Sequence, residues 1–533
     1  MRKSLLPVAG VALLALAGTA FGAEFQPFGA VGIGGAGVAR TTNAYAGHWN
    51  PAGLAFNEMT FSMKIGASAG LRVSKGLADN VDRLSEFTEE GADGLSTIDR
   101  LENLDGANPA AVADMVSLLN VIGDIEEQKG TLSLSANAVV ALQYKHLAFG
   151  AFGTMEGFAQ PLPDLVRILP TTTGGTSIAT PADFFTTLGT PVSEAGYQPR
   201  FFTDQQLQDI ASVFTDPTLT NGAVTADQAT AMAQALDQQF DTNRPQASAG
   251  DIAGTITTTL SSQLRASNDP VAAAANTIDD NRTAVMVKSL AYIEFPLSYG
   301  HPIDLGAFGK LGIGGSLKAI RGRVYQSRVE LIEGDENVES DDILDNFTKN
   351  FEETNAITVD LGALWKYNNW VSVGVVAKNL TSPSFDSPQL KNQNGEFVDE
   401  GGNIVAIPIQ DDKVKLKPQV RLGVAFDPLS WLTIAADLDL TENETVLSGL
   451  GFKSRHFGGG IELHPYTWFK VRGGAYTNLA NSEIGPVATA GLTLGTKWVN
   501  LDLDGAYGLE SARFEGKKYP KEARADLNLN VQF

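Results

Sequence analysis

The strongest constraint on the fold is a strict alternation of apolar and polar residues that recurs along the chain. It is clearest at the C-terminus, where every odd-numbered residue from Ala523 to Phe533 is apolar and every even-numbered residue is polar. This period of two places the apolar side chains on one face of a β-strand and the polar side chains on the other. A single segment of this kind would fit a soluble β-sandwich. A long series, with charges on the second face, is better explained by lipid on one side and a polar lumen on the other.

Segments with this pattern can be counted along the whole chain after residue 59. They cover residues 60–74, 131–144, 146–155, 284–297, 306–326, 354–367, 369–381, 414–427, 430–441, 454–464, 467–479, 485–496, 497–509 and 520–533. Very short turns alternate with variable or long loops, which is typical of outer-membrane barrels with short periplasmic turns. The sequence therefore predicts an all-β fold, in which residues 60–533 form a transmembrane antiparallel β-barrel of about fourteen strands.

The N-terminus is typical of an exported protein. The residues Met1-Arg2-Lys3 precede an apolar run from Leu5 to Ala17. Small residues then follow as far as Ala23. The run is shorter than the ~20 residues that a membrane-spanning helix needs, so we interpret residues 1–23 as a cleaved signal peptide. The absence of cysteine excludes a lipoprotein anchor, a disulfide scaffold and a thiolate metal site. The expected location is the outer membrane of a Gram-negative bacterium.

Composition and motifs argue against several classes of function. The net charge of −22 argues against nucleic-acid binding. The sequence contains no HExxH or GxSxG motif and no phosphate-binding glycine loop followed by lysine, so we expect no enzyme activity, cofactor or metal. Acidic residues concentrate in loops 76–130, with 13 acidic and 3 basic residues, and 327–353, with 10 and 2. Solvation of outer loops explains this charge, and calcium binding by clusters between Glu333 and Asp345 is the alternative.

Two insertions, residues 76–130 and 157–283, differ in character from the strands. In the second, residues 225–240 place alanines, Met232, Leu236 and Phe240 on one helical face. We expect further helix in 110–125, 248–264 and 270–278. These extracellular, partly helical insertions predict a cap over the barrel mouth, and a mobile surface insertion is the alternative.

Five of the six tryptophans lie within a few residues of a short turn. Amphipathic rings collect where lipid meets water, so this clustering predicts a periplasmic aromatic girdle. A soluble β-protein would give its core tryptophans no reason to gather at these turns. The girdle residues are Trp365, Trp370, Trp431, Trp468 and Trp498.

The N-terminal region resembles a known family. Residues 28–39, 44–46 and 48–55, with the motif Asn50-Pro51-Ala52, are similar to the first segment of FadL-like outer-membrane proteins. The resemblance implies that residues 24–59 form a small hatch inside a fourteen-stranded barrel. Residues 417–421 and 426–443 resemble more specifically the branch of conjugal transfer TraF-type proteins.

The resemblance implies passive uptake of small hydrophobic molecules, which the predicted lumen fits only in part. Neighbouring strands pair Lys415, Lys417 and Arg421 with Asp437 and Asp439; Glu462 with Lys470 and Arg472; and Asp502 and Asp504 with Arg524 and Asp526. A lumen lined in this way is wet or closed by salt bridges, and it is not an apolar conduit.

Three functions therefore remain: first a passive channel for small hydrophobic molecules, second a non-transporting scaffold, and third a barrel enzyme, which no group of residues supports. Lumen accessibility separates the first two. A passive channel for a hydrophobic ligand needs a movable hatch and a ligand-sized cavity, whereas a non-transporting scaffold of a conjugation or secretion apparatus can be filled solid. The expected partners are outer-membrane lipid and lipopolysaccharide, together with the barrel-assembly machinery. The last strand, ending in Phe533, resembles the assembly signal that this machinery reads.

Overall fold

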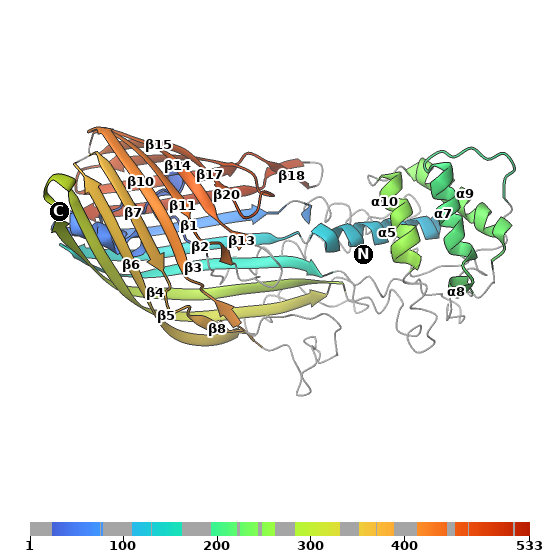
Figure 1. Cartoon of the computed structure of the whole chain (residues 1–533), viewed down its shortest axis with the longest axis horizontal. Helices are drawn as coiled ribbons and strands as arrows, with labels where there is room; N and C mark the ends of the chain where they lie inside the picture. The colour runs from blue at the N-terminus through green and yellow to red at the C-terminus, as the bar shows by residue number, and fades with distance from the viewer. Residues whose placement is uncertain are drawn as a thin grey trace.

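The computed structural model describes most of the chain (Figure 1). The described residues are 24–74, 76–77, 109–128, 130–162, 193–220, 224–243, 248–261, 283–330, 351–368, 370–388, 413–444, 453–466, 468–514 and 517–533. The signal peptide predicted for residues 1–23, the helix predicted for 270–278 and the acidic cluster between Glu333 and Asp345 lie outside these ranges.

Fourteen antiparallel strands form one closed barrel, as predicted, and β1 completes the ring by pairing with β20. The strands are β1 Phe61–Val73, β2 Leu132–Tyr144, β3 Leu147–Leu162, β4 Ala284–Asp304, β5 Lys310–Glu330, β6 Phe351–Tyr367, β7 Val371–Lys378, β10 Gln419–Leu429, β11 Leu432–Asp439, β14 His456–Tyr466, β15 Phe469–Asn478, β16 Val487–Gly495, β17 Val499–Gly508 and β20 Glu522–Gln532. Strand β5 begins four residues later than predicted, because Gly306–Phe308 forms a 3-10 turn.

The alternation in sequence becomes two different barrel faces. In β17, Leu501 and Leu503 are exposed on the outside, whereas Asp502 and Asp504 between them are buried inside. Closure of the ring pairs backbone groups of neighbouring strands, so the outer surface can meet lipid without unsatisfied strand edges. Among the described helices, none is long and apolar enough to cross a membrane.

The short turns lie at the end of the barrel where β1 begins and β20 ends. The Thr60 N–H donates to the Phe533 carbonyl at 3.0 Å. Four of the tryptophans predicted for the girdle are exposed near these turns, and Trp365 donates its indole N–H to the Phe308 carbonyl at 2.8 Å. Their contact with lipid remains a prediction. The sixth tryptophan, Trp49, is fully buried inside the barrel.

A separate group of helices lies beyond the opposite end of the barrel (Figure 1). It contains α5 Pro109–Gln128, α7 Asp204–Thr215, α8 Pro217–Thr220, α9 Ala226–Asn243, α10 Ala249–Gly254 and the π-helix η3 Thr255–Leu260. The helices share an apolar core that includes Ile122, Phe214 and Phe240. Helices α5 and α9, with α10 and η3, match three predicted segments, whereas α7 was not predicted. Its N-terminus is fixed by a capping box between Thr203 and Gln206.

Three small hairpins follow barrel strands at this same end. They are β8 Ser384–Asp386 with β9 Lys413–Lys415, β12 Asn443–Glu444 with β13 Lys453–Ser454, and β18 Ser511–Phe514 with β19 Lys517–Pro520. Each is a two-stranded sheet outside the ladder of the closed barrel.

Candidate functional site

The N-terminal segment, residues 24–59, lies inside the barrel, and we call it the hatch. It contains the short helices η1 Val31–Ile33, α2 Ala46–Trp49 and η2 Pro51–Phe56. Phe28, Tyr45 and Trp49 form a buried cluster, and the His48 ring stacks on Phe152 of β3 with centroids 5.4 Å apart. The hatch therefore uses the barrel wall to complete its core.

The Asn50-Pro51-Ala52 motif forms a corner between α2 and η2. The Asn50 side-chain oxygen accepts from the Ala52 N–H at 3.1 Å, and its amide donates to the Val38 carbonyl at 3.3 Å and to Ala363 of β6 at 3.1 Å. Pro51 starts η2, where its missing N–H costs no helical hydrogen bond. The corner thus joins two parts of the hatch to each other and to the wall.

The wall holds the hatch backbone through polar side chains. Asp437 of β11 accepts from both the Gly37 and Val38 N–H groups, at 2.9 and 3.0 Å. Further bonds join Gly29 N–H to Asp526, Gly34 N–H to Thr489, Arg40 to Glu462 and Tyr45 to Asn528. Several charges predicted to line a channel therefore bind the hatch instead of facing an open lumen.

Inward-facing glycines let the hatch lie directly against the wall. A Cβ atom at Gly314 would be 2.4 Å from the Ala52 nitrogen, and one at Gly458 would be 2.2 Å from the Gly34 oxygen. Both distances are too short for any side chain. Other wall glycines that approach the hatch in the same way are Gly300, Gly312, Gly362, Gly374, Gly474 and Gly491.

The structure joins several of the predicted lumen charges in ion-paired clusters. Arg472 bonds to Glu462 at 2.8 Å, Asp502 at 3.1 Å and Asp504 at 2.9 Å. The Lys470 nitrogen lies 3.7 Å from Glu462. The Arg421 guanidinium donates two hydrogen bonds to the Asp439 carboxylate, at 2.6 and 3.0 Å.

Other predicted positions differ from the expectation. Lys415 and Lys417 are exposed and lie before β10, with Lys415 in the small strand β9, because the chain joins the barrel only at Gln419. Arg524 does not pair with Asp502 or Asp504. The register places Arg524 opposite Ala506, and its guanidinium donates to the Gln26 side chain at 3.4 Å.

One buried cluster, formed by β4, β5, β6 and the residue after β7, was not predicted from the sequence. Lys318 is only 1% exposed and bonds to Glu294 at 2.9 Å, Asp360 at 3.0 Å and Asn379 at 2.8 Å. Glu294, Lys318 and Asp360 occupy polar positions of their strands, and Asn379 follows the last residue of β7. Only the register could have shown that they meet.

His48 connects the hatch to this side of the wall. Its Nε2 lies 2.8 Å from the Gln26 carbonyl, and the Lys378 ammonium lies 3.3 Å from its Nδ1. Burial, together with Lys378, lowers the pKa of His48 well below its usual value. The ring is therefore neutral, with Nε2 donating and Nδ1 accepting.

The β8–β9 hairpin places a side chain in the lumen from the end opposite the short turns. Phe385 of β8 is fully buried in an apolar cluster with Phe158 of β3, Tyr292 of β4 and Val324 of β5. A Cβ atom at Gly322 would lie 2.4 Å from the Phe385 ring, so this glycine makes room for it. The β8–β9 hairpin is thus folded inward against three strands.

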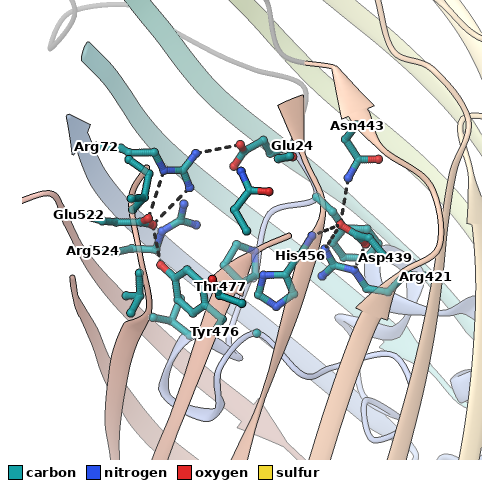
Figure 2. A pocket seen from close by; sticks show the side chains of 18 of the residues that line it. Glu24, Arg72, Arg421, Asp439, Asn443, His456, Tyr476, Thr477, Glu522 and Arg524 are labelled. Atoms are coloured by element: carbon teal, nitrogen blue, oxygen red, sulfur yellow. Dashed lines mark hydrogen bonds and ion pairs between the residues drawn. The ribbon is translucent and has the colours of Figure 1, made fainter. Parts of the chain in front are cut away.

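A small cavity lined by both polar and apolar residues lies next to the hatch (Figure 2). Figure 2 shows Arg72 between Glu24 and Glu522, with the Tyr476 hydroxyl bonded to Glu522 at 2.6 Å. The cavity has a volume of about 50 Å³, enough for a few waters. An apolar cavity that accepts benzene measures about 150 Å³, so this one is too small for such a ligand. The described residues include no cluster suited to a metal ion.

Comparison with solved structures finds similar proteins of very low sequence identity. The toluene transporter TbuX of Ralstonia pickettii is 11% identical with a TM-score of 0.40, and the match covers 96% of this chain and 99% of that one. The toluene transporter TodX of P. putida is 9% identical with a TM-score of 0.38, covering 96% and 98%. A Pseudomonas aeruginosa FadL homologue is 9% identical with a TM-score of 0.39, covering 96% and 99%. These similarities are too low to support a statement about substrate.

The sequence itself matches a family model, although no curated protein matches it. The model describes the TraF protein of the F plasmid transfer operon and matches residues 48–439, which is well over half of the chain. The matched region begins inside the hatch and runs through β11. It confirms the resemblance to TraF-type proteins, and we conclude that the chain belongs to the TraF family.

Proposed function

We propose that this protein is a closed barrel in the outer membrane that serves as an assembly component of a transfer or secretion apparatus. The observation that carries the proposal is that the lumen is filled from both ends. The hatch occupies one part and Phe385 of the β8–β9 hairpin another. The family description, which refers to a plasmid transfer operon, supports the same role. The helices that lie beyond the end of the barrel opposite the short turns would then offer a surface to other components.

Energetics favour a hatch that stays in place. Each of its hydrogen bonds to the wall contributes about 0.5–1.5 kcal/mol, and bonds to charged groups such as Asp437 contribute more. Removing the hatch would also leave Asp437 and Glu462 without their hatch partners in the lumen. Together these contributions make an open state rare.

A passive channel for small hydrophobic molecules is the second candidate, and one observation favours it. The pairing of β3 with β4 runs from Leu147 to Phe149 and resumes at Phe152, so Gly150 and Ala151 are skipped. They lie opposite a stretch of β4 that contains Pro296, which has no N–H to donate. This weak place in the wall would offer a sideways path into the membrane.

Locking the hatch to the wall distinguishes the two functions. A Cβ atom at Gly47 would lie 3.8 Å from the Ala148 Cβ, which is the usual distance in a disulfide. We would combine Gly47→Cys and Ala148→Cys with Ser298→Ala, since the Ser298 hydroxyl lies 2.8 Å from the new Cβ. The chain has no cysteine of its own, so the cross-link is unambiguous.

The locked protein should support transfer or secretion as well when oxidised as when reduced. Uptake of a hydrophobic dye should not change either. The control carries Gly47→Cys and Ser298→Ala without Ala148→Cys, and it receives the same oxidant. If oxidation abolishes dye uptake and reduction restores it only in the cross-linked variant, the protein is a channel with a moving hatch.

A further inference from the structure

The hatch contains one histidine, His48, at a point where it meets the wall. His48 lies on α2, one residue before Trp49 and two before the Asn50 corner. Its ring stacks on Phe152 of the wall and makes T-shaped contacts with Phe28 and Trp49, with centroids 4.7 and 5.9 Å away. Only 6% of His48 is exposed. A charge on this imidazole would therefore be enclosed by aromatic rings, away from most water.

Both ring nitrogens of His48 are committed to a neutral ring. Nε2 lies 2.8 Å from the Gln26 carbonyl, which accepts a hydrogen bond and cannot donate one. Nδ1 lies 3.3 Å from the Lys378 ammonium, which donates and cannot accept. A proton on Nδ1 would replace this hydrogen bond by a contact between two cations. The geometry therefore opposes protonation while the hatch is seated as in the structure.

The other charged groups near His48 do not offset this contact. Lys318 of β5 and Arg421 of β10 are cations that also act against a charged ring. Burial has the largest effect and Lys378 the next, and together they lower the pKa of His48 well below its ordinary value of about 6.5. The carboxylates on neighbouring strands are already engaged with the cations: Glu294 and Asp360 with Lys318, and Asp439 with Arg421.

Release of the hatch would remove the penalty on a charged His48. With water around its ring, His48 would regain its ordinary pKa of about 6.5. Because the pKa is depressed only in the seated state, the neutral ring favours seating fully above about pH 6.5, and this contribution is lost as the pH falls below that value. The ratio of seated to released hatch should therefore fall about tenfold for each pH unit below about 6.5.

We propose that His48 and Lys378 form a latch that holds the hatch at neutral pH and releases it in acid. Helix α2 runs directly into the Asn50 corner, so its displacement would also break the bonds from Asn50 to Val38 and Ala363. The latch goes beyond the proposed function, in which the hatch stays in place, because it names the condition that unseats the hatch. It responds to protons alone and needs no ligand.

Hydrogen exchange of residues 44–56 in the whole barrel tests the latch. The exchange rate divided by the intrinsic rate at each pH gives the opening constant of this segment, whether or not the lumen conducts. His48→Gln keeps a donor for Gln26 and an acceptor for Lys378, but it takes up no proton. Between about pH 7.5 and about pH 4.5, the opening constant of the parent should rise about 100-fold relative to that of the variant.

Two controls separate the latch from general effects of acid. His301→Gln removes a histidine that is exposed near the turn between β4 and β5, so it should respond to acid like the parent. Loss of the response in this control would contradict the latch. The oxidised cross-link of Gly47→Cys with Ala148→Cys, in the Ser298→Ala background, should suppress the response, and reduction should restore it.

A full acid response in His48→Gln would overturn the proposal. Lys378→Gln is an independent second variant, and it should weaken the response because a protonated ring would no longer face an ammonium. An unchanged response in Lys378→Gln would also count against the latch. Asp437 and Asp526 bond the hatch in every variant, so their own titration cancels in each ratio. Dye uptake that the cross-link abolishes at neutral pH would refute the scaffold function and leave the pH response as the test of the latch.

Discussion

The hatch and the helical domain are both additions to the barrel, yet they are stabilised in opposite ways. The helices α5, α7 and α9 pack around their own apolar core, and helix α7 carries its own N-terminal capping box. The hatch has only short helices, its aromatic cluster is completed by Phe152 of the wall, and its backbone bonds to wall side chains such as Asp437 and Asp526. The helical group therefore has an apolar core of its own, whereas the core and the hydrogen bonds of the hatch depend on the barrel wall.

Deleting residues 29–42 should have the largest effect on this comparison. The deletion removes the hatch contacts to Asp437, Thr489 and Glu462, and water would fill the space. We expect stable conductance steps in planar bilayers where the parent shows none. The folded barrel should still shift in the heat-modifiability assay. Normal folding without conductance would show that the hatch is not what closes the lumen.

Gly314→Val should displace the hatch corner without shortening the chain. The three atoms nearest to a Cβ at Gly314 all belong to the hatch backbone, at 2.4 to 2.6 Å. We expect conductance to rise toward that of the deletion. Gly315→Val is the control, because a Cβ at the next glycine would meet only ordinary contacts at 3.5 and 3.6 Å. Equal behaviour of the two variants would contradict the close seating of the hatch.

Phe240→Ala should affect the helical domain alone. Phe240 is 1% exposed in the helical core, and removing such a ring costs about 3–5 kcal/mol. We expect the helical circular dichroism signal to melt at lower temperature, while the barrel stays folded and closed. Conductance in this variant would mean that the helices, as well as the hatch, help to close the lumen.

Asn50→Ala should give the smallest effect. It removes the bonds to the Val38 and Ala363 carbonyls and the bond from the Ala52 N–H, each worth about 0.5–1.5 kcal/mol, but it leaves the bonds from the wall to Gly29, Gly34, Gly37 and Val38 in place. We expect rare, brief openings in single-channel recordings and unchanged heat-modifiability. Asn57→Ala is the control, since the Asn57 side chain bonds near the short turns: its amide donates to the Met59 and Lys145 carbonyls, and its oxygen accepts from the Met59 N–H. A silent Asn50→Ala barrel would limit the corner to a structural role.

The strands could be predicted because alternation is a local property. A membrane barrel needs apolar residues outside and polar residues inside, and this requirement is written at every second position of segments such as 523–533. The same local signal misled at Lys415, because the alternation continues through residues 413–417 although the chain has left the wall there.

By itself, the sequence determined the number of strands, their approximate bounds and the polar face that each presents. Only the tertiary structure decided which polar groups meet, because register and barrel closure bring together residues far apart in the chain. Arg472 thus pairs with Asp502 and Asp504, and Asp526 holds the Gly29 N–H instead of an arginine. Only the tertiary structure likewise showed why the wall contains inward-facing glycines. Their lack of a side chain lets the hatch backbone lie against the wall, and the sequence does not show which backbone lies there.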